Sequence, residues 1–171
     1  DGLFISGGFP ETQMEALEAN AGMRAAIRDA VEGGMPAYAE CGGLMYLSRS
    51  IAWKGRSREM VGVIDAEAAI HPEPVGRGYV RVRETGAGPW PLLDASGRPG
   101  EFPAHEFHYS SLDNLGPGHK FAYRMLRGEG LGKGRDGIVH KNLLACFIHQ
   151  RDVAGNRWTR RFVDFVRSIR S

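Results

Sequence analysis

The chain has 171 residues, of which 42% are hydrophobic and 25% charged, and this length suits one globular domain with a sizeable core. Its formal net charge of +2 is too small to indicate a nucleic-acid-binding surface. No apolar run approaches the roughly 18 residues that a membrane span requires, and no signal peptide opens the sequence. We therefore expect a cytoplasmic domain with neither nucleic acid nor membrane as a partner.

The cysteine count and the first residues bear on the chain's context. Cys41 and Cys146 are too few for a disulfide framework and suit a reducing compartment. Asp1 is not a start methionine, and a strand-like run follows it with no lead-in. We therefore expect this chain to be the C-terminal part of a longer protein.

The first 47 residues predict a strand–helix–strand–turn–helix succession. Residues 3–6 form a short apolar run that ends at two glycines, as a buried parallel strand would. Apolar residues at helical spacing predict a helix that begins near Pro10 and ends at Gly33 and Gly34. Residues 36–40 predict a second strand, which leads through Cys41 into a helix over residues 44–47. This succession is typical of a βαβ unit on a parallel sheet.

The remaining residues predict several strands and a closing helix. The strands are expected over residues 60–64, 78–84, 121–126, 137–140 and 143–148. Residues 85–100 are rich in glycine and proline and predict an exposed loop. Residues 156–170 predict an amphipathic helix with a solvated arginine face. The predicted fold class is α/β, with a mostly parallel central sheet flanked by helices.

Cys41 lies between the second predicted strand and the following helix. Such a turn exposes a side chain next to backbone N–H groups, and the positive end of the helix lowers a thiol pKa. The small residues Gly42 and Gly43 let the turn close. The pattern favours a nucleophile, and the alternative is a small buried hydrophobic residue.

Gly7 and Gly8 follow the first predicted strand. Because parallel strands gather their C-terminal ends at one sheet edge, this loop is expected beside Cys41. The N–H groups of Gly8 and Gly42 are then placed to form an oxyanion hole. The alternative for the two glycines is a plain turn.

A cysteine nucleophile needs a base, and His149 follows an apolar strand-like run. It is therefore expected at the same sheet edge, although a structural histidine remains the alternative. His105 and His108 are rivals, but their spacing of three places them on opposite faces of a strand. That spacing disfavours a shared metal, and no metal site is expected. Cys146 has apolar neighbours and is expected in the core.

Four blocks of sequence, in order, resemble one family. They are GGFPE (7–11), ECGGLMYL (40–47), HEFHYS (105–110) and ACFIH (145–149). Together they are similar to the class I glutamine amidotransferases, and most closely to the C-terminal glutaminase domain of cobyrinic acid a,c-diamide synthases. The resemblance extends over nearly the whole chain. It implies one flavodoxin-like domain over residues 1–171 with the cysteine on a strand-to-helix elbow.

The resemblance also implies a reaction. Cys41 attacks the side-chain amide of glutamine, His149 carries the proton to departing ammonia, and Gly7, Gly8 and Gly42 hold glutamine and its oxyanion. Ammonia then passes to a synthetase domain upstream of Asp1, which uses ATP and Mg²⁺. In cobalamin biosynthesis that domain amidates the a and c acetate groups of cobyrinic acid. The glutaminase domain itself needs no cofactor, and a homodimer is left open.

Two departures qualify the resemblance. Most class I relatives have a glutamate two residues after the histidine, where this chain has Arg151, and the cobyrinic-acid branch lacks that glutamate too. Glu106 is one candidate substitute, with His105 and His108 in supporting roles. The chain also has no phosphate-binding loop, so ATP is expected to bind elsewhere. Alternatives are a sirohaem-type or nickel tetrapyrrole acceptor, or a sensor, peptidase or non-catalytic protein of the same fold.

Overall fold

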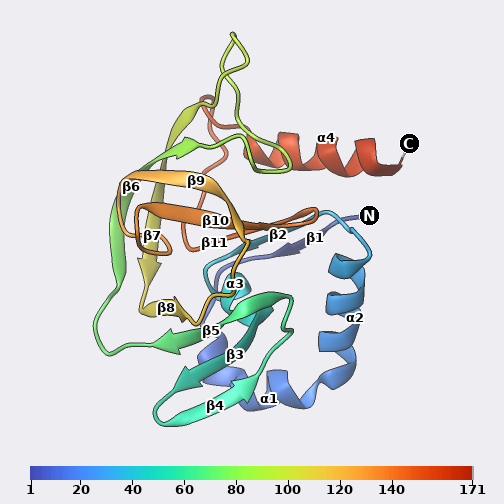
Figure 1. Ribbon diagram of the computed structural model, residues 1–171, viewed down its shortest axis with the longest axis vertical. Helices are drawn as coiled ribbons and strands as arrows, with labels where there is room; N and C mark the ends of the chain where they lie inside the picture. Colours follow the sequence, from blue (N-terminus) through green and yellow to red (C-terminus); the bar gives the residue numbers. More distant parts are fainter. Residues whose placement is uncertain (171) are drawn as a thin grey trace.

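The computed structural model describes residues 1–170. Two sheets and four α-helices make up this part of the chain (Figure 1). The strands of the larger sheet, in spatial order, are β1 (Leu3–Ile5), β2 (Ala37–Glu40), β11 (Leu143–Cys146), β10 (Arg135–His140), β9 (Lys120–Arg127), β6 (Gly76–Glu84) and β7 (Glu101–His108). The smaller sheet has the order β4 (Arg56–Glu59), β3 (Ser48–Trp53), β5 (Ile64–Ile70) and β8 (Ser110–Asp113).

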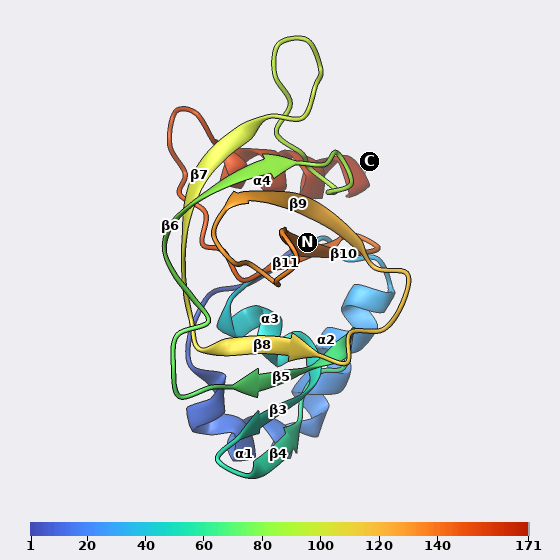
Figure 2. The same ribbon diagram turned by 60° about the vertical axis from the view of Figure 1, so that its left-hand side comes forward.

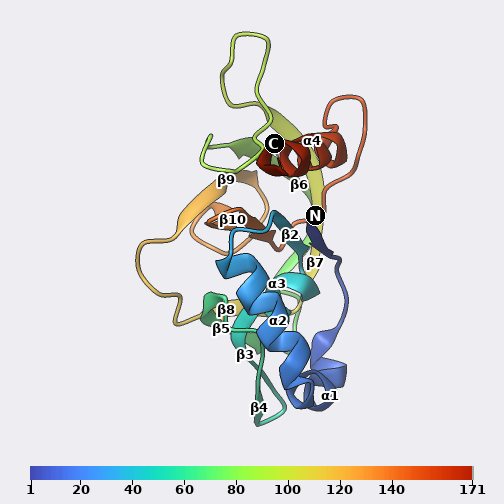
Figure 3. The same cartoon turned by 90° about the vertical axis from the view of Figure 1, so that its right-hand side faces the viewer.

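The helices lie on both sides of the larger sheet. They are the 3₁₀ helix η1 (Pro10–Gln13) and the α-helices α1 (Met14–Ala19), α2 (Ala21–Glu32), α3 (Gly42–Leu47) and α4 (Trp158–Arg170). Helix α3 lies between the two sheets, and α4 lies at the opposite end of the molecule from α1 (Figures 1 and 3). The expected single helix before Gly33 is thus divided, because Asn20 ends α1 and caps α2 through its side-chain oxygen.

The parallel arrangement is confirmed only around the elbow. Strand β2 pairs in parallel with β1, as the βαβ pattern predicts, and it also pairs in parallel with β11. The pairings from β11 through β10, β9 and β6 to β7 are all antiparallel. The prediction of a mostly parallel sheet therefore holds for the first three strands and is wrong for the others, which are joined by hairpins and loops rather than crossover helices.

The predicted strand over residues 60–64 is also wrong for residues 60–63. These residues connect β4 to β5, and Gly62 has a φ of 75°, which interrupts an extended strand. The N–H groups of Met60 and Val61 bond instead to carbonyls of β3 and α3. Met60 and Val61 are apolar because they are buried, and a short apolar run is also typical of a buried strand. The prediction therefore mistook a buried connection for a strand.

The larger sheet separates two hydrophobic cores. On β2, Ala37 and Ala39 face the core shared with α2, α3 and the smaller sheet, whereas Tyr38 faces the other core. That second core holds Trp90 and Trp158, and it is the core on which α4 packs. The loop over residues 85–100 is confirmed as largely irregular, and part of it projects beyond α4 (Figure 1).

The larger sheet curls strongly, so that β7, the last strand in spatial order, returns toward β11 near the middle of the sheet (Figure 2). His105 on β7 and His149 just beyond β11 form an antiparallel bridge. The N–H of each residue donates to the carbonyl of the other, at 2.7 Å and 3.2 Å. The bridge places β7 beside the C-terminal end of β11, where the candidate site lies.

Candidate active site

Cys41 occupies a strained turn between β2 and α3. Its φ of 46° and ψ of −105° lie outside the regions that residues other than glycine normally adopt. The turn is held from both sides, because the Cys41 N–H donates to the Cys146 carbonyl and the Cys41 carbonyl accepts from Met45. The predicted cysteine elbow is therefore confirmed.

Glycines let three backbone segments meet at this turn. A methyl group on Gly42 would clash with the backbone of Gly8, and one on Gly43 would clash with the carbonyl of Ile5. A Cβ on Gly7 would lie 2.6 Å from Cε1 of His149 and 3.7 Å from Cβ of Cys41. The structure thus brings Gly7, Gly8 and Gly42 to the side of Cys41, where the sequence placed them.

His149 lies at the same edge, three residues after β11. Its ring stacks on that of His105, with centroids 4.9 Å apart and planes 19° from parallel. Hydrogen bonding with Cys41, and then with Glu40, raises the pKa of His149 to about 10, although partial burial opposes the charge. The arrangement favours an imidazolium beside the Cys41 sulfur.

Glu40 is a site residue that the sequence did not single out. Its Oε2 lies 3.3 Å from Nδ1 of His149. Its Oε1 accepts hydrogen bonds from the Tyr38 hydroxyl at 2.7 Å and from the backbone N–H of Gln150 at 3.0 Å. The contact follows from the pairing of β2 with β11, which sets Glu40 opposite Cys146, three residues before His149. A sequence-based prediction of that pairing would have pointed to Glu40.

Arg151 and Glu106, the two positions considered for an orienting carboxylate, lie elsewhere. The Arg151 guanidinium lies over the ring of Tyr79, 5.8 Å from its centroid, and the residue is exposed. Glu106 points to the opposite face of β7 from His105, because side chains alternate along a strand. The carboxylate that contacts the His149 ring belongs to Glu40.

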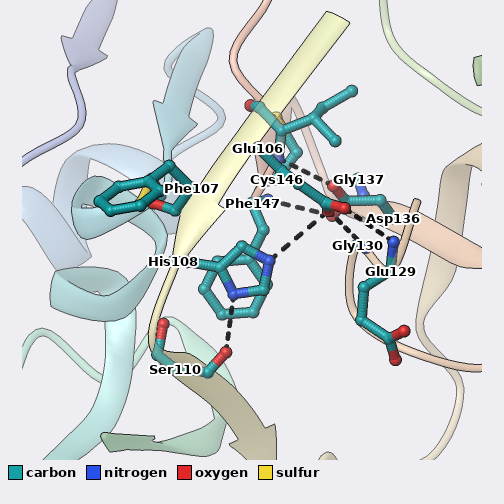
Figure 4. Close-up of polar contacts among 12 residues, drawn as sticks. Glu106, Phe107, His108, Ser110, Glu129, Gly130, Asp136, Gly137, Cys146 and Phe147 are labelled. Carbon is teal, nitrogen blue, oxygen red and sulfur yellow. Dashed lines mark hydrogen bonds and ion pairs between the residues drawn. The ribbon is translucent and has the colours of Figure 1, made fainter. Parts of the chain in front are cut away.

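Glu106 and His108 form a separate buried cluster (Figure 4). The Glu106 carboxylate accepts from the N–H groups of Glu129 and Gly130, both at 2.9 Å, and lies 3.6 Å from Nε2 of His108. Burial would raise the pKa of Glu106, but the neighbouring His108 and the hydrogen bonds from these N–H groups lower it overall. His108 bonds through Nδ1 to the Ser110 carbonyl and stacks on Phe147. The expected opposite placement of the two histidines is confirmed.

Asp136 fixes the segment that leads to His149 (Figure 4). Its buried carboxylate accepts from the N–H groups of Phe147 and Ile148 as well as Gly137. Burial raises the pKa of Asp136 to about 6, and the three N–H donors oppose that rise. Cys146 lies in the core with its sulfur fully buried, as expected.

A narrow pocket opens beside Cys41. It is lined by Gly8, Phe9, Glu11, Cys41, Met45, Ile70, Phe107, His108, Tyr109 and Ser110. Oε2 of Glu11 is buried there without a hydrogen-bond partner among residues 1–170, and burial raises the pKa of Glu11. Sequence reasoning assigned no role to Glu11. A carboxylate oxygen that lacks a partner within the protein is suited to a cationic group of a ligand.

Three further observations concern other kinds of site. No group of three or more histidine, cysteine, aspartate or glutamate side chains in the described part of the chain is arranged to hold a metal ion. No helix within residues 1–170 is long and apolar enough to cross a membrane. A wider hollow on the outer face of β6, β7 and β9 is lined partly by Arg81, Arg83 and Arg127, and Cys41 and His149 are not among its lining residues.

Comparison with known proteins agrees with this geometry. Residues 1–153 match the model of the CobB/CobQ-like glutamine amidotransferase domain. The chain belongs to this family. A cobyrinate a,c-diamide synthase of Magnetococcus marinus is 44% identical over 158 residues, which are 92% of this chain and 33% of that protein. One of Archaeoglobus fulgidus is 39% identical over 163 residues, 95% of this chain and 34% of that protein.

The glutamine amidotransferase domain seen here spans about a third of the length of these curated relatives. Solved structures share its fold. A glutamine amidotransferase crystal structure aligns with a TM-score of 0.66 and 20% identity, covering 96% of this chain and 78% of that one. The structure of PurLQS from Thermotoga maritima aligns with a TM-score of 0.67 and 12% identity, covering 98% and 80%. At these identities the likeness concerns the fold.

Proposed function

We propose that this chain is the glutaminase domain of an ATP-dependent amidoligase. The observation that carries the proposal is the strained turn at Cys41, which lies with His149 around Gly7: a Cβ there would be 3.7 Å from Cβ of Cys41 and 2.6 Å from Cε1 of His149. A thiolate is the nucleophilic form of cysteine, and a neighbouring imidazolium stabilises it. A buried structural cysteine would need neither the strained backbone nor the histidine.

The proposed reaction begins when the Cys41 thiolate attacks the side-chain carbonyl carbon of glutamine. The carbonyl becomes an oxyanion, for which the N–H groups of Gly8 and Gly42 are the proposed donors. His149 gives its proton to the amide nitrogen, the C–N bond breaks, and ammonia leaves a γ-glutamyl thioester on Cys41. Water then attacks the thioester while His149 takes its proton, and glutamate departs as the thiolate reforms.

Glu11 is the residue that we propose for recognition of the substrate's α-ammonium group. It lines the same pocket as Cys41, and its Oε2 has no partner among the described residues. An ammonium group would supply the missing donors and would favour the ionised carboxylate. This interaction would distinguish glutamine from simple amides that lack the α-ammonium group.

The acceptor of the ammonia is proposed from the relatives. Their printed name, cobyrinate a,c-diamide synthase, and their greater length support a synthetase domain upstream of this one. That domain would use ATP and Mg²⁺ to activate the a and c acetate groups of cobyrinic acid for amidation in cobalamin biosynthesis. The cytoplasm supplies glutamine and ATP and is the proposed compartment.

A glutamine-analogue diazo-ketone tests the proposal on the complete protein. We expect it to label Cys41 alone, because the Cys146 sulfur is fully buried and burial holds the pKa of Cys146 well above the ordinary value. Cys41→Ser should abolish both labelling and glutamate release, and His149→Ala should abolish glutamate release in a folded protein. Labelling that persists in the Cys41→Ser variant, or near-normal turnover by His149→Ala, would refute these assignments.

A further inference from the structure

We propose that Glu40 is the positioning residue of this site, the carboxylate that orients His149 in place of the one lacking at Arg151. The proposal rests on the glutaminase function and adds a residue to it. Oε2 of Glu40 lies 3.3 Å from Nδ1 of His149. An ionised carboxylate only accepts hydrogen bonds, so Nδ1 is the donor of this pair. The other ring nitrogen, Nε2, is then left to exchange protons with Cys41 and the substrate.

The fold explains how a residue next to the nucleophile can reach the histidine. Glu40 is the last residue of β2, and it lies opposite Cys146, the last residue of β11. His149 follows three residues later, so the two side chains emerge at the same edge of the sheet. Because Cys41 turns away from the strand at a φ of 46°, adjacent residues can act on the imidazole from different directions.

The carboxylate of Glu40 is itself fixed. Its Oε1 accepts from the Tyr38 hydroxyl and from the Gln150 N–H, which leaves Oε2 for His149. Burial raises the pKa of the Tyr38 phenol well above the ordinary value, so its hydroxyl keeps the proton that it donates. With both oxygens engaged, the carboxylate has one favourable orientation, and that orientation presents Oε2 to the imidazole.

A chain of buried hydrogen bonds extends this support to helix α4. The Gln150 side chain donates to Tyr38 at 2.9 Å and to Tyr123 at 3.0 Å, and it accepts from Asn156 at 3.1 Å. Asn156 in turn accepts from Arg161 on α4 at 2.8 Å. Asn156 and Arg161 lie beyond residues 1–153, the part that matches the family model. The C-terminal helix thus contributes to the rigidity of the carboxylate that orients His149.

The alternative is that Glu40 only holds Tyr38 and Gln150 together. The two roles differ in what they do to His149. A positioning carboxylate stabilises the imidazolium, so its removal shifts the pH at which His149 titrates. A merely structural carboxylate would affect the stability of the fold without moving that titration.

Glu40→Gln in the complete protein separates the two roles. The amide oxygen can still accept from Tyr38 and from the Gln150 N–H, but the negative charge is lost. We expect kcat for glutamine hydrolysis to fall at least about a hundredfold with little change in KM. We also expect the pH profile of Cys41 alkylation by iodoacetamide to shift, because His149 becomes less basic. Glu40→Asp should restore part of kcat and of the wild-type profile.

Glu32→Gln is the matched control. Glu32 forms the same kind of pair, with its Oε1 2.9 Å from Nε2 of His140, and it lies before β2, away from the elbow. It should leave kcat and the alkylation profile unchanged. A wild-type kcat and alkylation profile in Glu40→Gln, or a loss of kcat with an unshifted profile and a lower Tm, would overturn the positioning role. If wild-type protein released no glutamate from glutamine, the proposed function itself would fail, whatever the Glu40 variants showed.

Discussion

Gly7→Ala is the substitution that tests most directly how the candidate site is assembled. A Cβ at this position would lie 2.6 Å from Cε1 and 3.4 Å from Nδ1 of the His149 ring. The neighbouring substitution Gly8→Ala adds the same methyl group to open space, with no heavy atom within 4 Å. The two variants therefore differ in whether the new methyl group strikes the imidazole.

The size of the effect follows from the clash. Restoring an ordinary contact of about 3.4 Å needs the ring or the loop to move by about 0.8 Å. Misplacement of a catalytic group by about 1 Å can cost about a hundredfold in rate. A hundredfold loss corresponds to about 2.7 kcal/mol of transition-state stabilisation. We therefore expect kcat of Gly7→Ala to fall by about that factor, and the loss in Gly8→Ala to be far smaller because its N–H is retained.

The assay is glutamate release from glutamine by the complete protein, with the Tm of each variant measured in parallel. A folded Gly7→Ala variant with a low kcat and slow alkylation of Cys41 would support the reasoning. Wild-type activity in Gly7→Ala would refute it, because the imidazole would then tolerate the displacement. Equal losses in the two variants would also refute it, since only one methyl group contacts His149.

Three further predictions concern neighbouring groups. Glu11→Gln should raise KM for glutamine about tenfold and leave kcat nearly unchanged, because a hydrogen bond to a charged group contributes about 1.5 to 3 kcal/mol. A lower kcat at unchanged KM would contradict a role of Glu11 in binding the α-ammonium group. Cys41→Ser should lower the pKa of His149 from about 10, measurable by NMR titration. Because the folded pKa exceeds the unfolded one of about 6.5, the stability that His149 contributes is complete below about pH 6.5 and is lost as the pH rises through about 10. Thermal unfolding across that range should show the loss in wild type and less of it in Cys41→Ser. Glu106→Gln should reduce the free energy of unfolding by about 1 to 3 kcal/mol, because the amide has one acceptor oxygen where the carboxylate offers one to each of two backbone N–H groups. Denaturant unfolding measures this change, and an unchanged free energy of unfolding would argue against an ionised Glu106.

The sequence predicted the part of the fold that depends on local signals. An apolar strand, a paired-glycine loop and a cysteine before a helix identify the βαβ unit, and the structure confirms that unit. The antiparallel strands β10, β9, β6 and β7 could not be ordered in the same way. Their apolar patterns indicate burial but carry no information on direction or neighbour.

The candidate site shows the same division. Cys41, His149 and the two glycines follow strands, and strand ends meet at a predictable edge. The contact of Glu40 with His149 depends on the register between β2 and β11, whose paired residues are more than a hundred positions apart in the chain. The proposed role of Glu11 depends on a buried carboxylate oxygen with no hydrogen-bond partner among residues 1–170, and no sequence pattern signals such an oxygen.

The bridge between His105 and His149 closes the strands from β11 through β10, β9 and β6 to β7 into a hydrogen-bonded ring, with β1 and β2 outside it. The outer side of β7 at this point is therefore not free to recruit a strand from another molecule. The bridge also lies beside the His149 imidazole, so the ring cannot open here without releasing the histidine for which we propose the proton transfer. Hydrogen exchange at the amides of these two residues would report how often the ring opens, and inactivation should follow the same rate.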